Sequence, residues 1–225
     1  MQDAAAWFQA EKDGVRARLL KYSKKAFDMI PPVDEPQILD AGCGSGVSAV
    51  ELTGWSNGHI TCIDIDEKML EVLRGKIEKY GLGERISIVS GSILDMDFPE
   101  HSFDIIWAEG SIYAIGFGKG LIEWGRLLKP GGCMVIHDAE GNVKGKIRQI
   151  ADCGYDLLGH FVLDIDVWRE EYFIPLENLI DKAQAVYGGE PGVLEMLGVA
   201  RREVEMFNKS PENNSSECFV IRKNV

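Results

Sequence analysis

Three closely spaced glycines are the residues of this sequence that most directly suggest chemistry. Gly42, Gly44 and Gly46 follow an apolar run and precede a segment that can begin a helix. Glycine suits such a turn because the backbone takes unusual angles there, and because a side chain would block a ligand lying across the strand end. The turn therefore predicts a ligand site where the strand ends. The spacing Gly44-x-Gly46-x-x-Ala49 also fits the relaxed dinucleotide pattern, so a structural turn and a nicotinamide site both stay open.

Asp64 adds a second chemical group to this turn. It closes another apolar run, 18 residues after Gly46. A carboxylate in that place can accept hydrogen bonds from both hydroxyls of a ribose, and such charge-assisted bonds contribute about 1.5–3 kcal/mol each when desolvated. Asp66, two residues later, has the position of a helix N-cap. The turn and Asp64 together predict a ligand that carries a ribose.

Three later residues are candidates for catalysis. Glu109 and His137 lie near the ends of two further apolar runs, and Tyr113 lies in the loop after Glu109. Acidic and imidazole side chains can move a proton, and a loop tyrosine can line a substrate pocket. Each has an alternative: Glu109 can anchor a cofactor ammonium, His137 can be a hydrogen-bonded core residue, and Tyr113 can pack its own loop.

A parallel α/β sheet is the arrangement predicted to position these residues. Five apolar runs alternate with amphipathic stretches, and each run is apolar nearly throughout, as strands covered on both faces are. Helices are expected over 68–80 and over 121–128. Pro130 is expected to end the second helix, and the two glycines after it to reverse the chain into the fifth strand. The five predicted strands are 37–41, 59–64, 86–90, 103–109 and 133–139.

Two segments lie outside this alternation. Residues 1–30 are predicted to be helical and are joined to the sheet by the stiff, proline-rich stretch 30–36. Residues 142–209 are richer in helix signals, and a helical turn there would bring Trp168 close to two other aromatic residues as a satellite apolar core or a substrate cage. The remaining predicted elements are a sixth strand over 157–164, a turn over 210–216 and a final strand over 217–223.

The combined motifs resemble the class I S-adenosylmethionine-dependent methyltransferase family. The likeness runs through most of residues 37–140, in the family's order and spacing. It implies a Rossmann-like α/β fold, with a seven-stranded, mostly parallel sheet, an antiparallel last strand, helices on both faces, N-terminal helices and a helical cap. The matching stretches are ILDAGCGSG, ITCIDIDEKMLE, ISIVSGSILDMDFP, FDIIWAEG and LLKPGG.

The resemblance also implies how the chain is organised. One methyltransferase domain is expected over 1–225. Within it, residues 1–36 are expected to form an N-terminal helical lid over the cofactor, residues 37–140 the cofactor-binding core, and residues 141–225 the cap and the last strands.

S-adenosyl-L-methionine is the cofactor that the resemblance implies. The glycine turn would face its methionine part, Asp40 would hold its amino group, and Asp64 would bind its ribose. Ser92 stands where the family commonly has an acidic residue against the adenine, so this sequence departs from the pattern there. The implied cofactor-binding residues are Asp40, Gly42, Gly44, Gly46, Asp64, Ile65, Met69, Ser92, Ile93 and Glu109.

Composition narrows the partners. The formal charge of −12 argues against a nucleic-acid binder, and no charge-free apolar run reaches the roughly 20 residues that span a bilayer. The five cysteines are scattered, without a metal-ligand pattern, so reduced thiols and no metal site are expected. The N-terminus lacks the layout of a signal peptide, which predicts a cytoplasmic protein. The apolar surface of the cap could close on the core or on a second subunit, so a monomer and a homodimer both stay open.

The predicted activity is methyl transfer to a small-molecule acceptor. Because this reaction depends mainly on alignment, which can supply roughly 7–11 kcal/mol, the lack of an obvious general base does not argue against an enzyme. A nicotinamide-dependent oxidoreductase is the first alternative, disfavoured by the LLKPGG stretch and the final strand. A non-catalytic cofactor-binding protein is the second.

Overall fold

The computed structural model describes residues 4–139, 141–188, 190–210 and 215–225. The chain divides into two compact units. One is helical and consists of Met1–Lys21 and Leu163–Ser215, and the other contains the sheet and consists of Tyr22–Val162 and Ser216–Val225. The segments expected to be a lid and a cap are thus each divided between the two units.

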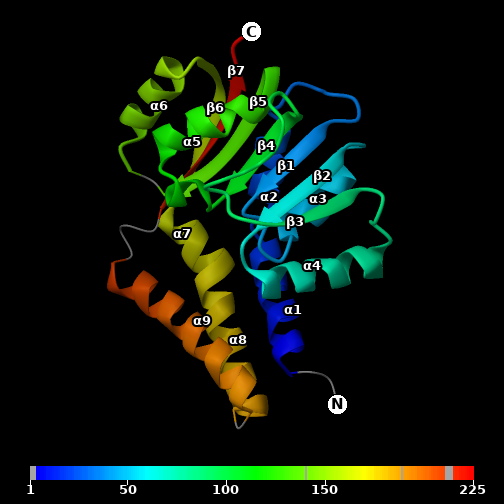
Figure 1. Ribbon diagram of the computed structural model, residues 1–225. Helices are drawn as coiled ribbons and strands as arrows, with labels where there is room; N and C mark the ends of the chain where they lie inside the picture. Colours follow the sequence, from blue (N-terminus) through cyan, green and yellow to red (C-terminus); the bar gives the residue numbers. More distant parts are fainter. Residues whose placement is uncertain (1–3, 140, 189, 211–214) are drawn as a thin grey trace. The chain divides into compact units, whose positions relative to one another are not determined.

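The sheet has seven strands in the order β3-β2-β1-β4-β5-β7-β6 (Figure 1). Strands β1 to β5 pair in parallel, and β7 runs antiparallel to β5. This confirms the predicted seven-stranded, mostly parallel sheet with its antiparallel last strand. The strands are β1 (Gln37–Ala41), β2 (His59–Asp64), β3 (Ile86–Ser90), β4 (Phe103–Glu109), β5 (Leu128–Ala139), β6 (Tyr155–Leu163) and β7 (Ser216–Lys223).

Successive residues of each central strand enter two different cores. On β4, Ile105 and Trp107 belong to the core under the helices α2, α3 and α4, whereas Ile106 and Ala108 belong to the core under α5 and α6. This alternation is why the strands are apolar throughout their length. This unit contains α2 (Leu20–Phe27) except for its first two residues, and the whole of α3 (Val47–Trp55), α4 (Glu67–Tyr80), α5 (Phe117–Glu123) and α6 (Val143–Asp152).

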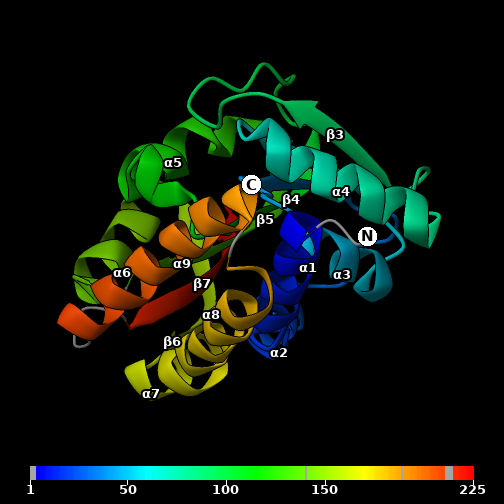
Figure 2. The ribbon, with the colours of Figure 1, turned by 90° about the horizontal axis from the view of Figure 1, so that it is seen from below.

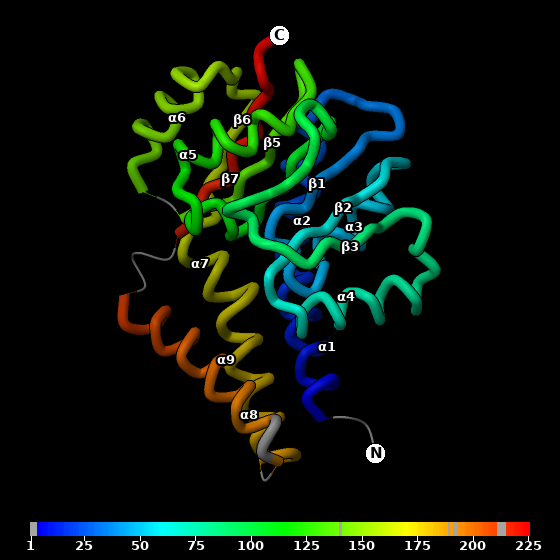
Figure 3. The backbone as a smooth tube through the Cα atoms, in the orientation of Figure 1, coloured from blue at the N-terminus to red at the C-terminus, as the bar shows by residue number. Residues whose placement is uncertain are grey.

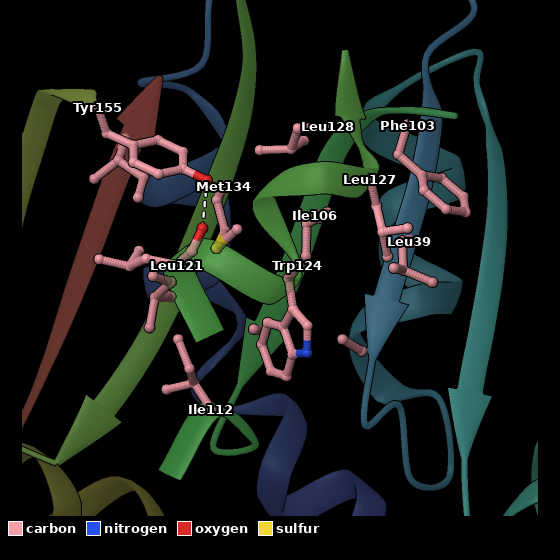
Figure 4. Packing of buried hydrophobic residues seen from close by; sticks show 14 of the residues in the cluster. Leu39, Phe103, Ile106, Ile112, Leu121, Trp124, Leu127, Leu128, Met134 and Tyr155 are labelled. Atoms are coloured by element: carbon pink, nitrogen blue, oxygen red, sulfur yellow. Dashed lines mark hydrogen bonds between the residues drawn. The ribbon is translucent and has the colours of Figure 1, made fainter. Parts of the chain in front are cut away.

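Figure 4 shows part of the core under α5 and α6. The Trp124 ring is 1% exposed there, among Ile106, Leu127 and other apolar side chains. Its Nε1 donates to the carbonyl of Ile93 at 3.0 Å, and the buried Tyr155 hydroxyl donates to the carbonyl of Leu121 at 2.8 Å. The polar atoms of both aromatic side chains are therefore satisfied inside the apolar core.

The predictions for residues 121–132 are wrong in their boundaries. Helix α5 ends at Glu123 and is followed by a 3₁₀ turn, η2 (Gly125–Leu127). The chain does not reverse at the two glycines, because β5 already begins at Leu128, which pairs with Phe103. The register shifts between Phe103 and Ile105, and Gly131 has a φ of +74°. A bulged strand thus accommodates the proline and glycines that resemble a helix stop and a turn.

The helical unit contains the elements α1 (Ala4–Ala17), α7 (Ile165–Trp168), η3 (Arg169–Phe173), α8 (Ile174–Tyr187) and α9 (Pro191–Lys209). Helices α8 and α9 pack side by side, as two views show (Figures 1 and 2). Trp168, Tyr172 and Phe173 meet as predicted, with ring centroids 5.2–6.3 Å apart, and Phe173 stacks on Phe207. Tyr172 and Phe173 are buried, which favours the satellite core. The predicted turn over 210–216 lies largely outside the described residues.

Within the described residues, none of the helices combines the length and apolar character needed to cross a bilayer.

Candidate active site

The glycine turn connects β1 to α3 at the carboxyl edge of the sheet, and Figure 3 traces this passage along the backbone. Gly42, Gly44 and Gly46 have φ values of +81°, +52° and +73°, a region that favours glycine. A Cβ on Gly42 would lie 2.6 Å from the Cβ of Ser111, and one on Gly46 would lie 2.3 Å from Leu73 Cδ1. A Cβ on Gly44 would meet nothing within 4 Å. Two glycines therefore allow close packing, and the middle one borders open space.

Hydrogen bonds of Asp64 connect the glycine turn to the end of β2. Its Oδ2 accepts the backbone N–H of Gly44 at 2.7 Å, and its Oδ1 accepts that of Asp66 at 2.9 Å. The carbonyl of Ile63 accepts the N–H groups of Gly42 and Cys43. Each carboxylate oxygen retains a further lone pair, so Asp64 can still accept hydroxyl groups of a ligand.

Asp66 is the N-cap of α4, as predicted. Its Oδ1 accepts the backbone N–H groups of Lys68 at 2.9 Å and Met69 at 3.3 Å. Ile65, between the two aspartates, is 76% exposed, which leaves a large apolar side chain open beside Asp64. Met69 is half-buried on the first turn of α4.

Two polar atoms near the turn are buried without a partner among the described residues. They are Oδ2 of Asp40, on a residue 3% exposed, and Oγ of Ser111, on a residue 6% exposed. Burial raises the pKa of the Asp40 carboxyl well above its usual value, and the negative charges of Glu109 and Asp64 raise it further. An unsatisfied buried polar group costs about 1–3 kcal/mol, so an N–H-bearing or cationic ligand group would stabilise this place.

Glu109 is held by three donors from three elements. Its Oε1 accepts the Ser23 hydroxyl of α2 at 2.6 Å and the Trp107 indole N–H at 3.1 Å, and its Oε2 accepts the Ser48 hydroxyl of α3 at 2.9 Å. The carboxylate is therefore fixed in place by the chain itself. Sequence reasoning missed both serines, although Ser23 is a buried polar residue in an otherwise ordinary helix.

His137 lies next to Glu109, because the two residues pair across β4 and β5. Its Nε2 is 2.7 Å from the hydroxyl of Ser216 on β7, and its ring is half-buried. Tyr113 lies in the 3₁₀ turn η1 (Ile112–Ala114) and is 73% exposed. The structure thus brings Glu109 and His137 together and leaves Tyr113 open to solvent.

The two residues predicted after β3 have local hydrogen bonds. Ser92 Oγ accepts the backbone N–H of Leu94 at 3.2 Å, and its carbonyl accepts that of Asp95. The carbonyl of Ile93 accepts the Trp124 indole, which ties this loop to the core. Both residues are half-buried.

The cysteines and the acidic residues show no metal centre in the described part of the chain. All five cysteines are free. No group of three or more histidine, cysteine, aspartate or glutamate side chains that could hold a metal ion occurs among the described residues.

Comparison with known proteins places residues 38–132 in a family described as a methyltransferase domain. Sterol 24-C-methyltransferase ERG6B of Gibberella zeae is 33% identical over 103 residues, which are 45% of this chain and 27% of that protein. The chain spans between 27% and 52% of the length of the first curated relatives that it matches, so their whole-protein activities do not transfer directly.

Two solved structures share the fold at low identity. A putative sarcosine dimethylglycine methyltransferase from Galdieria sulphuraria has a TM-score of 0.75 and 19% identity, over 93% of this chain and 86% of that chain. The cyclase SpnF has a TM-score of 0.73 and 16% identity, over 91% of this chain and 80% of that chain. Since one is called a methyltransferase and the other a cyclase, the fold alone does not fix the reaction.

Proposed function

We propose that this chain, whose residues 38–132 are a methyltransferase domain of the class I S-adenosylmethionine-dependent family, transfers a methyl group from S-adenosyl-L-methionine to a small-molecule acceptor. The supporting observation is the arrangement at the glycine turn: Gly44 borders open space and donates to Asp64, while the buried Asp40 Oδ2 has no partner in the described chain. A ligand with an ammonium group and a ribose complements both acidic side chains, because a bound ammonium would favour the ionised form of the Asp40 carboxyl.

The residues at the turn divide the work of binding. Asp40 and Ser111 would meet the amino-acid part of the cofactor, and Asp64 the ribose hydroxyls. The exposed Ile65, with Met69, would cover one side of the adenine, and Ser92 with Ile93 would meet it from the loop after β3.

The cofactor supplies an activated methyl group on a sulfonium and departs as a neutral thioether. The chain's contribution is then mainly to align the acceptor and exclude water. Three hydrogen-bond donors hold the Glu109 carboxylate in place. It would therefore keep a negative charge in a fixed position beside the sulfonium or the acceptor. His137 would take a proton where the acceptor loses one, and Tyr113 would contact the acceptor from the loop after β4.

A small acceptor fits the relatives, which include sterol methyltransferases, and it fits the formal charge of −12, which disfavours nucleic acid. We further propose that the protein acts in the cytoplasm as a monomer or a homodimer. Cell fractionation and light scattering of the purified protein test these two points.

Calorimetric titration tests the cofactor directly. S-adenosylhomocysteine should bind the purified protein, and NAD should not. Tight binding of NAD without binding of S-adenosylhomocysteine would replace the methyltransferase by the oxidoreductase alternative.

A metabolite screen with methyl-labelled cofactor then tests turnover. Label should appear in a small acceptor in step with release of S-adenosylhomocysteine. Cofactor binding without label transfer to any compound of a broad library favours the non-catalytic alternative, or a reaction of another kind on the same fold.

A further inference from the structure

A cavity of about 540 Å³ opens at the edge of the sheet opposite the glycine turn. It lies where β1, β2 and β3 begin, because Pro36, Asn57 and Arg85 line it just before these strands. Sites for small molecules occupy roughly 300–1,000 Å³, so this cavity has the size of a ligand site. The proposed methyl transfer does not use it.

The walls of this amino-edge cavity are mainly apolar and aromatic. Phe27 and Trp55 lie with ring centroids 5.7 Å apart, and the 1% exposed Ile105 belongs to the sheet behind them. The proline-rich stretch 30–36 supplies the outer wall through Pro31, Pro32 and Val33. Flat rigid walls of this kind match a flat apolar ligand.

The polar side chains that line the cavity each have at least one partner in the chain, and the exposed carboxylate of Asp28 accepts from Lys24. They are those of Asp28, Ser56, Asn57 and Arg85. Arg85 donates through Nε to the carbonyl of Gly58 and through Nη2 to that of Ser56. Asn57 donates to Asp34 and accepts the backbone N–H of Glu35. An uncharged ligand can therefore enter without displacing these bonds, and it gains contact with the apolar walls.

Helices α2 and α3 and the indole ring of Trp107 connect the walls of this cavity to Glu109. Helix α2 carries Ser23, which donates to Glu109, and one turn later Phe27, which lines the cavity. Helix α3 carries Ser48, the other hydroxyl on Glu109, and Trp55 at its end in the cavity wall. The Trp107 ring lies 6.4 Å from both Phe27 and Trp55, and its indole donates to Glu109.

We propose that the amino-edge cavity binds an uncharged aromatic molecule, and that its occupancy changes how tightly the site at the glycine turn holds its ligand. Separating or tilting Phe27 and Trp55 would shift α2 and α3 and so move the two hydroxyls that fix Glu109. The second half of the proposal rests on the proposed function, because it needs the cofactor at the turn. Coupling of this kind is reciprocal, so the cofactor also changes affinity at the cavity.

A fluorescent dye tests the cavity itself. N-phenyl-1-naphthylamine is uncharged and aromatic, and its emission rises in apolar surroundings. Gly54→Phe should weaken its binding at least about tenfold, because Gly54 lines the cavity and a Cβ there meets nothing within 4 Å. Val33→Trp should do the same from the outer wall.

Gly75→Phe is the matched control, since Gly75 also has open space around its Cβ but lies on α4, outside the cavity. It should leave dye affinity within about twofold of the parent. Equal dye binding by all four proteins, or none by the parent, overturns the cavity site. Circular dichroism establishes that each variant is folded before the comparison.

Calorimetry with S-adenosylhomocysteine, with and without saturating dye, tests the coupling. In the parent protein, dye should change the affinity for S-adenosylhomocysteine at least about fivefold. In Gly54→Phe, dye should leave this affinity unchanged. An affinity that is the same with and without dye overturns the coupling and leaves the cavity site standing. Failure of S-adenosylhomocysteine to bind at all counts against the proposed function, while the dye titration still decides the cavity.

Discussion

The two edges of the sheet differ in whether their polar side chains have hydrogen-bond partners within the chain. At the carboxyl edge, the buried Asp40 Oδ2 and Ser111 Oγ lack partners within the described residues. At the amino edge, Arg85 and Asn57 are bonded to nearby backbone and side-chain groups, and the cavity between them is walled by aromatic and proline residues. Because burying an unpaired polar atom costs free energy, the first edge calls for a polar ligand and the second for an apolar one.

The largest expected effect is a difference in stability between substitutions at two glycines of the same turn. Gly46→Val should lower the free energy of unfolding by about 2–4 kcal/mol, since its Cβ would lie 2.3 Å from Leu73 at a φ of +73°. Gly44→Ala should lower it by only about 1 kcal/mol, from backbone strain alone, yet weaken S-adenosylhomocysteine binding. Urea denaturation and calorimetry measure the two effects. Equal losses of stability would mean that the turn is packed alike at both positions.

Asp40→Asn should change how stability depends on pH. The folded-state pKa of Asp40 is raised above the unfolded value of about 3.9, so the neutral form is favoured in the folded protein. Stability contributed by that form is lost as pH rises from the unfolded value through the folded pKa, and the variant removes this loss. Denaturation from pH 4 to pH 8 should give a flatter curve for Asp40→Asn than for the parent.

The exposed Asp97→Asn is the control for this pH series. Its curve should follow that of the parent. A parent curve that rises through this range because of Asp40 would contradict the assigned direction of the pKa change.

Asp64→Ala should weaken S-adenosylhomocysteine binding by about 1.5–3 kcal/mol, because a ribose acceptor is lost. The structure adds a cost to folding, since Asp64 also accepts the N–H groups of Gly44 and Asp66. Asp64→Asn, which retains one oxygen acceptor, should therefore be more stable than Asp64→Ala. Unchanged affinity in both variants would remove Asp64 from the binding site.

Ser23→Ala should lower the free energy of unfolding by about 1–2 kcal/mol, because a buried hydroxyl that donates to Glu109 is removed. Ser102 is half-buried, and its hydroxyl donates to the carbonyl of Pro99 in an exposed hydrogen bond, so it provides a control that should change little on substitution by alanine. Thermal denaturation of both variants makes the comparison. Equal changes would show that the Ser23–Glu109 bond stabilises the fold no more than an exposed hydrogen bond does.

The smallest expected effect is at the amino edge. Asn57→Ala should lower the free energy of unfolding by about 0.5–1 kcal/mol, since its bonds to Asp34 and Glu35 are exposed to water. S-adenosylhomocysteine affinity should stay unchanged, because no hydrogen bond of Asn57 reaches Glu109. A loss of affinity would break the distinction between the two edges.

Motifs that are local in the chain were predictable. Strands β1 to β4 have the predicted bounds, because a strand buried on both faces leaves a continuous apolar run between polar segments. The glycine turn, the Asp66 cap and the family resemblance also depend on residues close together in sequence. The LLKPGG stretch misled because proline and glycine suit a bulged strand as well as a turn, and only pairing with β4 distinguishes them.

The sequence by itself determined the class of fold, the edge of the sheet that carries the glycine turn, and the two acidic residues beside it. Only the tertiary structure decided which polar atoms have hydrogen-bond partners. Ser23 and Ser48 lie 86 and 61 residues from Glu109 and reach it only because α2 and α3 pack on the same face of β4. The amino-edge cavity likewise gathers its walls from segments between Phe27 and Ile105. Short-range patterns carry backbone conformation, whereas hydrogen-bond partners and cavities arise from contacts between distant segments, which no local pattern encodes.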